Sequence, residues 1–287
     1  MNPIDMHYVD YGSISKTLYS AGVRVLHHNA LMWITIACYA NPQLSAIDVG
    51  CCTGKLTGIL SNAYKQVYAF DPNPVLNSKI LFKSLKWSII DMSKCSYTQC
   101  ACGEYANEMT YYEYNYTNGE PALWFNGLHF DPNNTTLVQT NSRTVTVAPL
   151  DDLVAREIEI GFIKIDAELH DYHVLAGARR IIADHKPVVI VEYGNNTNIL
   201  SILAQYGYAC YTLTGTNDTL LPLVNADTCD LVAIPSTTVL SPTLTVAMHL
   251  YYSSLHRLLQ TGYNCADHLQ TVDNIVGSLL AKRMQYR

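Results

Sequence analysis

Two groups of residues in this sequence have the types and spacing needed to bind a nucleotide-like ligand and to move a proton. The first is AIDVGCCTGKLTG at residues 46–58, in which Asp48 ends an apolar run and Gly50 and Gly54 form a turn before a helical pattern. A second acid, Asp71, ends the next apolar run, 17 residues beyond Gly54. A carboxylate at that point can accept strong hydrogen bonds from two hydroxyl groups, such as those of a ribose.

Three ligands compete for the glycine turn. A phosphate-binding P-loop needs four residues between its glycines and a Ser or Thr after its lysine, whereas here three residues intervene and Leu56 follows Lys55. A dinucleotide site needs a glycine where Cys52 stands. The third ligand is S-adenosylmethionine, whose binding site has an acid at each of two strand ends and a glycine turn between them. This pattern fits the sequence best. The residues predicted to bind it are Asp48, Gly50, Cys51, Gly54, Asp71, Pro72, Asn73 and Ala101.

The second group lies in GFIKIDAELHDYHVLAG at residues 161–177. Asp166 ends a predicted strand, and Glu168, His170 and Asp171 follow before a helix. In an open parallel sheet, ligands bind in the crevice beyond the strand ends, so these side chains are candidates for acid–base chemistry. Two local explanations stay open: Asp171 only caps the helix, and His170 only belongs to an exposed loop.

Five segments together resemble the FkbM-type methyltransferases, a family of S-adenosylmethionine-dependent O-methyltransferases. The matching segments are Asp48–Gly54, Phe70–Pro74, Pro149–Leu153, Ile163–Ala178 and Pro187–Glu192, followed by Gly207-Tyr208 and Ile234-Pro235, so that the resemblance covers about residues 43–236. The sequence departs from the family pattern at four positions, where Cys52 replaces asparagine, Asp71 replaces glutamate, Leu169 replaces glycine and Asp171 replaces glutamate.

The resemblance implies an α/β, Rossmann-like class I methyltransferase fold with a mainly parallel, seven-stranded sheet covered by helices on both faces. It also implies methylation of a hydroxyl on a sugar, a lipid or another small molecule. We expect Asp166 to lie near the methyl-transfer centre and Glu168 or His170 to orient or deprotonate the acceptor. Asp171 and Glu192 are predicted to bind substrate. No metal is expected, although Asp166 and Glu168 form a possible pair of ligands for a divalent ion.

Alternating patterns divide the chain into a helical segment 1–42, a methyltransferase domain 43–236 and a helical extension 237–287. Strands are predicted at 45–49, 66–70, 95–101, 161–165, 187–191, 208–213 and 231–234, and helices at 13–40, 56–63, 76–85, 151–157, 173–184 and 199–205. Residues 103–148 differ in texture and are expected to form a hairpin-like insertion, with strands at 109–116 and 143–147, that shapes the acceptor pocket.

Bulk composition limits the alternatives. The net charge is −6 and only 15% of residues are charged, so no broad basic surface is expected. One predicted helix face is basic, with Lys79, Lys83 and Lys86, so an RNA ribose 2′-O-methyltransferase stays open as an alternative function. A catalytically degenerate scaffold protein is the other alternative. Nine cysteines without a CxxC pair, and no signal peptide or membrane-spanning run, lead us to expect a cytoplasmic protein. The apolar residues of 243–287 allow an oligomer.

Overall fold

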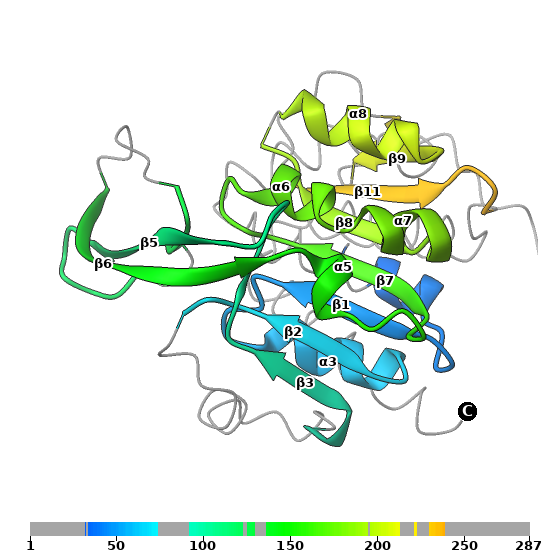
Figure 1. Ribbon diagram of the computed structural model, residues 1–287, viewed down its shortest axis with the longest axis horizontal. Coiled ribbons are helices and arrows are strands. Elements are labelled where there is room, and N and C mark those ends of the chain that lie inside the picture. Colours follow the sequence, from blue (N-terminus) through cyan, green and yellow to red (C-terminus); the bar gives the residue numbers. More distant parts are fainter. Residues whose placement is uncertain are drawn as a thin grey trace, which may run out of the picture.

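The arrangement of the chain comes from a computed structural model that describes residues 32, 34–73, 92–122, 125–129, 136–194, 196–212, 221–222 and 230–238. Its centre is a sheet with strand order β10-β9-β11-β8-β7-β1-β2-β3 (Figure 1). The strands are β1 (Ser45–Val49), β2 (Val67–Phe70), β3 (Cys95–Thr98), β7 (Ile160–Ile165), β8 (Val188–Glu192), β9 (Tyr208–Thr212), β10 (Leu221–Pro222) and β11 (Asp230–Pro235).

The sheet is mostly parallel. Strands β3, β2, β1, β7 and β8 pair parallel to one another, and β11 lies antiparallel between β8 and β9. The α/β, Rossmann-like fold predicted from the sequence is confirmed. The sheet has one strand more than the seven expected, because the two-residue β10 pairs antiparallel with the edge of β9. A strand that short leaves no hydrophobic pattern to recognise.

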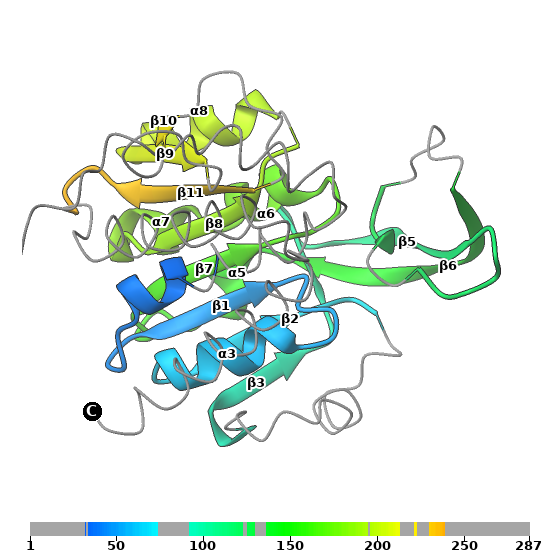
Figure 2. The same cartoon turned by 180° about the vertical axis from the view of Figure 1, so that it is seen from behind.

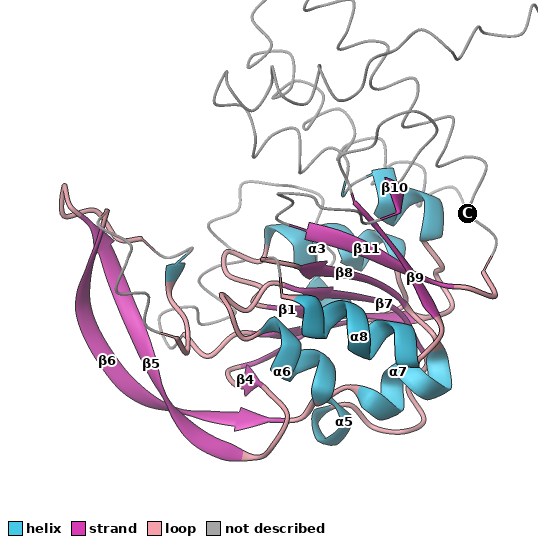
Figure 3. Ribbon diagram, turned by 90° about the horizontal axis from the view of Figure 1, so that it is seen from above, coloured by secondary structure: helices cyan, strands magenta, loops and turns pink. Residues whose placement is uncertain are grey.

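Helices cover both faces. Helix α3 (Lys55–Ala63) packs on one face, and α5 (Leu150–Leu153), α6 (Asp171–Ala176), α7 (Arg179–His185) and α8 (Thr197–Gln205) lie on the other (Figures 2 and 3). The central strands are mostly apolar, as expected for parallel strands buried on both sides. For example, every residue of β1 is buried, and so are the first four residues of β8. The main core lies between β1, β7 and β8 and helices α6, α7 and α8.

Two helix predictions need correction. The helix expected over 173–184 is two helices, because the chain turns at Gly177, where an added Cβ would lie 2.0 Å from the carbonyl oxygen of Gly103. The helix expected over 151–157 ends at Leu153. Asp151 of α5 caps the start of α7, because its carboxylate accepts the N–H groups of Arg180 and Ile181 at 2.7 and 3.1 Å.

The insertion contains a hairpin whose two strands are longer than the expected 109–116 and 143–147, and it forms a second sheet. Strands β4 (Ala101–Cys102), β5 (Asn107–Tyr116) and β6 (Leu137–Ala148) have the order β4-β6-β5, and the β5–β6 pair extends well away from the central sheet (Figure 1). The strand expected over 95–101 is therefore divided. A short 3₁₀ turn, η2 (Met92–Lys94), precedes β3, which ends at Thr98, and Ala101 belongs to the second sheet.

Several predictions lie wholly or largely outside the described residues: most of the helix at 13–40, of which 34–39 are helical here, the helix at 76–85 with its lysine face, and the extension after 238. Within the part of the chain that is described, no helix has the length and apolarity needed to cross a membrane.

Candidate functional site

Four carboxylates gather at one edge of the central sheet. The register aligns the last residue of β1, Val49, with Phe70 at the end of β2 and with Ile165 at the end of β7, and Ile165 with Val191 near the end of β8. Asp71 and Asp166 directly follow β2 and β7, while Asp48 and Glu192 lie at the ends of β1 and β8. Because these strands are parallel, their carboxyl ends lie at one edge of the sheet.

The glycine turn lies directly on this edge. Gly50 has φ 71°, and an added Cβ would lie 1.7 Å from the carbonyl oxygen of Asp166, so that only glycine fits here. The N–H groups of Gly50 and Cys51 both donate to the carbonyl of Phe70, at 2.9 and 3.2 Å. The turn is therefore fixed to β2 on one side and packed on β7 on the other. Gly54, also at φ 71°, closes it by donating to the carbonyl of Cys51.

Asp71 is held by backbone donors. Its buried carboxylate accepts the N–H of Cys52 and the N–H of Asn73, each at 2.9 Å. Burial raises the pKa of Asp71 to about 6, the two N–H bonds oppose that rise, and the charge of Asp166 adds to it. A carboxylate has roughly four acceptor positions, so Asp71 retains capacity for the two hydroxyls of a ribose. Asn73 is buried beside it and Pro72 is partly exposed.

Two of the residues predicted to bind the cofactor, Asp48 and Ala101, make contacts that stabilise the fold. Asp48 accepts a hydrogen bond of 2.6 Å from the Thr57 hydroxyl, which joins the end of β1 to α3. Burial raises the pKa of Asp48 to about 6, and the Thr57 bond opposes that rise. Ala101 does not join the strand-end group through its side chain, which packs with Tyr111, Leu128 and Val147 in the core of the small sheet.

The carboxylates of the second group form a cluster with a neighbour. Oxygens of Asp166, Glu168 and Glu192 all lie within 4.8 Å of one another, close enough to share protons or to hold one divalent cation. Burial, followed by the charge of Asp166, raises the pKa of Glu168 to about 9 and that of Glu192 to about 8. In the absence of a cation the cluster therefore holds protons at neutral pH.

Lys164 supplies the opposing charge. Its buried ammonium lies 3.2 Å from Asp166 Oδ2 and 3.5 Å from Asp230 Oδ1 of β11. Burial alone would lower the pKa of Lys164, but the charges of Asp166 and Asp230 raise it above its ordinary value, so the ammonium stays charged. The sequence assigned no role to Lys164 or Asp230, because nothing in the spacing of β7 and β11 shows that the two strands bring them together.

The turn after Asp166 is strained. Glu168 and Leu169 have φ values of 47° and 71°, in the left-handed region that non-glycine residues rarely adopt. Each such residue costs about 1–3 kcal/mol. The buried Asp171, the first residue of α6, closes the turn by accepting the N–H of Ala167 at 2.9 Å. Burial raises the pKa of Asp171 to about 6. This hydrogen bond holds the turn, and the predicted contact of Asp171 with substrate stays a prediction.

His170 is buried, at 5% exposure, and so does not belong to an exposed loop. Its Nδ1 lies 2.9 Å from Nε2 of His129, and its ring stacks on His173 with centroids 4.7 Å apart. Burial, followed by the neighbouring histidines, lowers the pKa of His170 to about 4, so that the ring is neutral at physiological pH. One ring nitrogen of His170 is thus already engaged by His129.

The insertion contributes residues that sequence patterns did not identify. An added Cβ on Gly127 would lie 3.0 Å from Cβ of Glu168, and His129 reaches His170, so segment 125–129 packs on the 168–170 turn. Pairing of Gly127 with Tyr112 anchors that segment on β5. No motif could have indicated this contact, which joins residues about 40 positions apart through tertiary packing.

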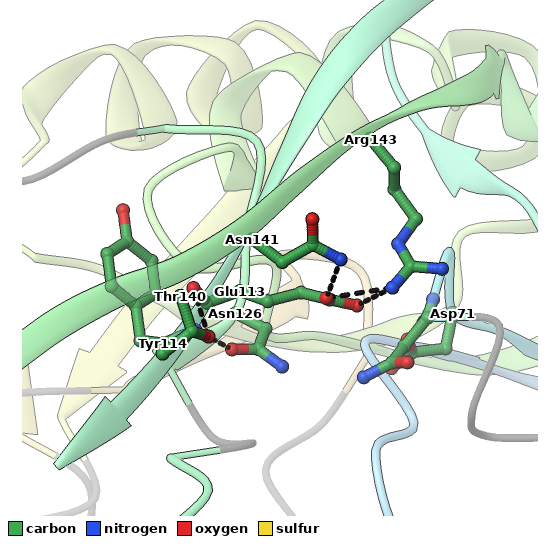
Figure 4. A network of polar contacts seen from close by, with 8 residues as sticks. Asp71, Glu113, Tyr114, Asn126, Thr140, Asn141 and Arg143 are labelled. Atoms are coloured by element: carbon green, nitrogen blue, oxygen red, sulfur yellow. Dashed lines mark hydrogen bonds and ion pairs between the residues drawn. The ribbon is translucent and has the colours of Figure 1, made fainter. Parts of the chain in front are cut away.

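The hairpin also adjoins the glycine turn through Tyr111. Burial, followed by the charges of Asp71 and Glu113, raises the pKa of the Tyr111 phenol. Beside it, the carboxylate of Glu113 accepts hydrogen bonds of 2.8 Å from both Arg143 and Asn141 across the hairpin (Figure 4). The guanidinium of Arg143 is thus paired with Glu113 within the hairpin. The carboxylate of Asp71 is bonded to backbone N–H groups.

Comparisons with known proteins agree with this arrangement. Residues 48–210, more than half of the chain, match the methyltransferase FkbM domain. No curated protein matches. Among solved structures, the chain is similar to a methyltransferase FkbM from Methylobacillus flagellatus KT, with 18% identity and a TM-score of 0.40 over 67% of this chain and 44% of that one. The alignment thus spans less than half of that protein.

Two other similar structures contain a cofactor or its product. One is magnesium protoporphyrin IX methyltransferase from Synechocystis PCC 6803 with bound SAM, at 12% identity and a TM-score of 0.39 over 75% of this chain and 82% of that one. The other is a putative methyltransferase from Streptococcus mutans in complex with SAH, at 11% identity and a TM-score of 0.40 over 71% and 93% of the two chains.

Proposed function

The chain belongs to the FkbM methyltransferase family, and we propose that it transfers a methyl group from S-adenosylmethionine to a hydroxyl group of a small molecule, sugar or lipid. The observation that carries the proposal is the position of Asp71. Its carboxylate follows β2, beside the Gly50–Gly54 turn, and is held by two backbone N–H groups. That arrangement combines an acceptor for ribose hydroxyls with a turn that allows close approach of a ligand.

The residues present fit this cofactor. Asp71 would accept the ribose hydroxyls, and the turn that includes Cys51 and Cys52 would border the adenosyl and methionine parts. When bound, S-adenosylmethionine supplies an electrophilic methyl group on a sulfonium, and the protein's task is then to align the acceptor and receive its proton. Asp166 follows the strand next to the turn, where its negative charge favours a positively charged ligand.

Glu168 is the group best placed to receive the proton. As the acceptor oxygen forms its bond to the methyl carbon, the hydroxyl proton would pass to the Glu168 carboxylate. With its pKa raised to about 9, Glu168 is protonated at neutral pH when no cation is near. A positive charge beside the cluster favours the ionised form, so that Glu168 becomes a proton acceptor only with the methyl donor in place. Glu192 would hold the hydroxyl, and His170 would fix the turn.

The negative charge of the carboxylate cluster favours an uncharged methyl acceptor. Asp166, Glu168 and Glu192 lie together there, and the only cation that the described residues place against them, Lys164, is buried and already paired. With the methyl donor bound and Glu168 ionised, a phosphodiester brought to this cluster would meet like charge. This weighs against the RNA alternative and favours a neutral sugar, lipid or other small molecule.

Isothermal titration calorimetry of the full chain tests cofactor binding, with S-adenosylmethionine and S-adenosylhomocysteine as ligands. We expect both to bind and Asp71→Ala to abolish binding, while Asp152→Ala, which removes an exposed carboxylate, leaves it unchanged. A parent protein that binds neither ligand would refute the proposal.

Transfer of a tritiated methyl group into fractionated cell extract tests the reaction itself. We expect label in an uncharged, hydroxyl-bearing fraction and loss of that label with Glu168→Gln. Label confined to RNA would support the alternative of a 2′-O-methyltransferase. Cofactor binding without transfer to any fraction would instead support a catalytically inactive scaffold.

A further inference from the structure

Tyr111 of β5 is a buried residue whose hydroxyl the mechanism has not yet used. Only 2% of it is exposed, and it belongs with Ala101 to the core of the small sheet. Ala101 lies three residues after Thr98, which pairs with the end of β2 and accepts the N–H of Asp71 at 3.4 Å. The charge of Asp71 accordingly acts on the phenol and raises its pKa. The insertion thus brings a buried hydroxyl to the carboxylate that the cofactor ribose would meet.

The side-chain amide of Asn126 determines how this hydroxyl can bond. Its Oδ1 accepts the N–H of Tyr114 at 2.9 Å, which turns its NH₂ group to other partners. The hydrogen bond between Asn126 and Tyr111 opposes the rise in the pKa of Tyr111, as a bond from a donor to the phenol oxygen does. Tyr111 therefore accepts from Asn126 and retains its own hydrogen to donate to a ligand.

Arg143 of β6 supplies a second donor beside Tyr111. The two residues are direct partners across the β5–β6 ladder, so their side chains leave the same face of the hairpin. Nη2 of Arg143 donates to Glu113 at 2.8 Å, whereas Nε is buried and has no hydrogen-bond partner among the described residues. Figure 4 shows the guanidinium directed toward Asp71. Because a buried donor without an acceptor is costly, Nε indicates that a ligand supplies one.

We propose that Tyr111 and Arg143 complete the ribose site of the cofactor, the phenol and Nε each donating to one of the two ribose hydroxyl oxygens. The two hydroxyls carry two hydrogens, for which Asp71 is the acceptor, and two oxygens, for which these residues are the donors. The site thus distinguishes a ribose from a deoxyribose, and the insertion binds the methyl donor as well as shaping the acceptor side. This inference rests on the proposed function and adds the residues that determine its cofactor specificity.

Two deoxy analogues of S-adenosylhomocysteine test the proposal, one without the 2′ hydroxyl and one without the 3′ hydroxyl. Their Kd values and that of S-adenosylhomocysteine are measured on the full chain by calorimetry, and thermal unfolding verifies that each variant folds. We expect Tyr111→Phe, which keeps the packed ring, to weaken binding of S-adenosylhomocysteine about tenfold. The same change should not weaken binding of one of the two analogues, because that analogue lacks the oxygen to which the phenol donates.

Arg143→Lys is the second variant, since lysine keeps a positive charge for Glu113 but lacks the Nε donor. It should also weaken binding of S-adenosylhomocysteine about tenfold, and the analogue whose binding it does not weaken should be the other one. Tyr208→Phe is the matched control. Tyr208 is also buried, but it lies on β9, toward the opposite edge of the sheet from β2, and its hydroxyl donates to the carbonyl of Pro187 at 2.8 Å. All three Kd values should be the same in this variant as in the parent.

The outcomes separate the two proposals. Failure of the parent chain to bind S-adenosylhomocysteine would overturn the proposed function and this inference with it. If the parent binds S-adenosylhomocysteine but Tyr111→Phe binds it equally well, or weakens all three ligands by the same factor, the donor role of Tyr111 and Arg143 alone is overturned.

Discussion

The affinity for S-adenosylmethionine should depend on pH through Asp71. Burial raises the pKa of this carboxyl to about 6, and only the ionised form accepts hydrogen bonds from two hydroxyls while it also accepts the N–H groups of Cys52 and Asn73. A group with a pKa of 6 is about 90% ionised at pH 7 and about 9% ionised at pH 5. The Kd should therefore be nearly constant above pH 7 and increase about tenfold between pH 7 and pH 5.

Substitution of Asp71 separates its contribution from that of Asp48, whose pKa is also raised to about 6. In Asp71→Asn, two hydrogen bonds to a charged acceptor are lost, each worth about 1.5–3 kcal/mol, so the Kd should rise at least about a hundredfold at pH 7. The tenfold change due to Asp71 should also disappear. Any pH dependence that remains between pH 5 and 7 would come from Asp48 or another group.

Calorimetric titrations at pH 5, 6, 7 and 8 provide the measurement, with circular dichroism to verify folding at each pH. Asp152→Asn, an exposed carboxylate on α5, is the control and should follow the parent protein. A parent Kd that is the same at pH 5 and pH 7, for folded protein, would show that Asp71 is not the carboxylate that binds the ribose.

Three further changes test other parts of the site. Gly50→Ala should lower the Tm and abolish cofactor binding, because its Cβ would lie 1.7 Å from the carbonyl oxygen of Asp166; an unchanged Tm and Kd would contradict that packing. Lys164→Met should lower stability by about 3–5 kcal/mol in chemical denaturation, since it leaves Asp230 and Asp166 without their cation; a loss below 1 kcal/mol would show that the pair is dispensable. The pKa of Glu168 is raised to about 9 from its ordinary 4.5, so its contribution to stability is present below about pH 4.5 and is lost as the pH rises to about 9. Glu168→Gln removes that loss, and its Tm should exceed that of the parent by more at pH 9 than at pH 5; equal differences at both values would refute the shift.

Much of the fold could be predicted from the sequence because its signals are local. The fully apolar strand β8, VVIV before Glu192, and the run that ends at Asp48 have the composition of buried parallel strands. The acids Asp71 and Asp166 directly follow β2 and β7, and parallel topology brings the ends of these strands to one edge of the sheet.

The parts that the sequence did not predict depend on contacts between distant residues. His129 reaches His170, and Lys164 meets Asp230, only because the insertion and β11 fold back on the site. Neither pair has a spacing that a pattern could detect. Gly177 was included in a helix because its neighbours have helical periodicity, but its close packing on Gly103 turns the chain.

The short β4–β6 ladder has a consequence for how such a protein can diversify. Ala101 pairs with Val147 and Cys102 with Ala148, so the chain departs for the hairpin and returns from it on adjacent strands, about 5 Å apart. An insertion whose two ends are adjacent can be lengthened, shortened or exchanged while the central sheet and the glycine turn keep their geometry. Under the proposed function, we expect recombination at this junction to change which molecule is methylated, provided that the new insertion again supplies partners for the turn at 168–170.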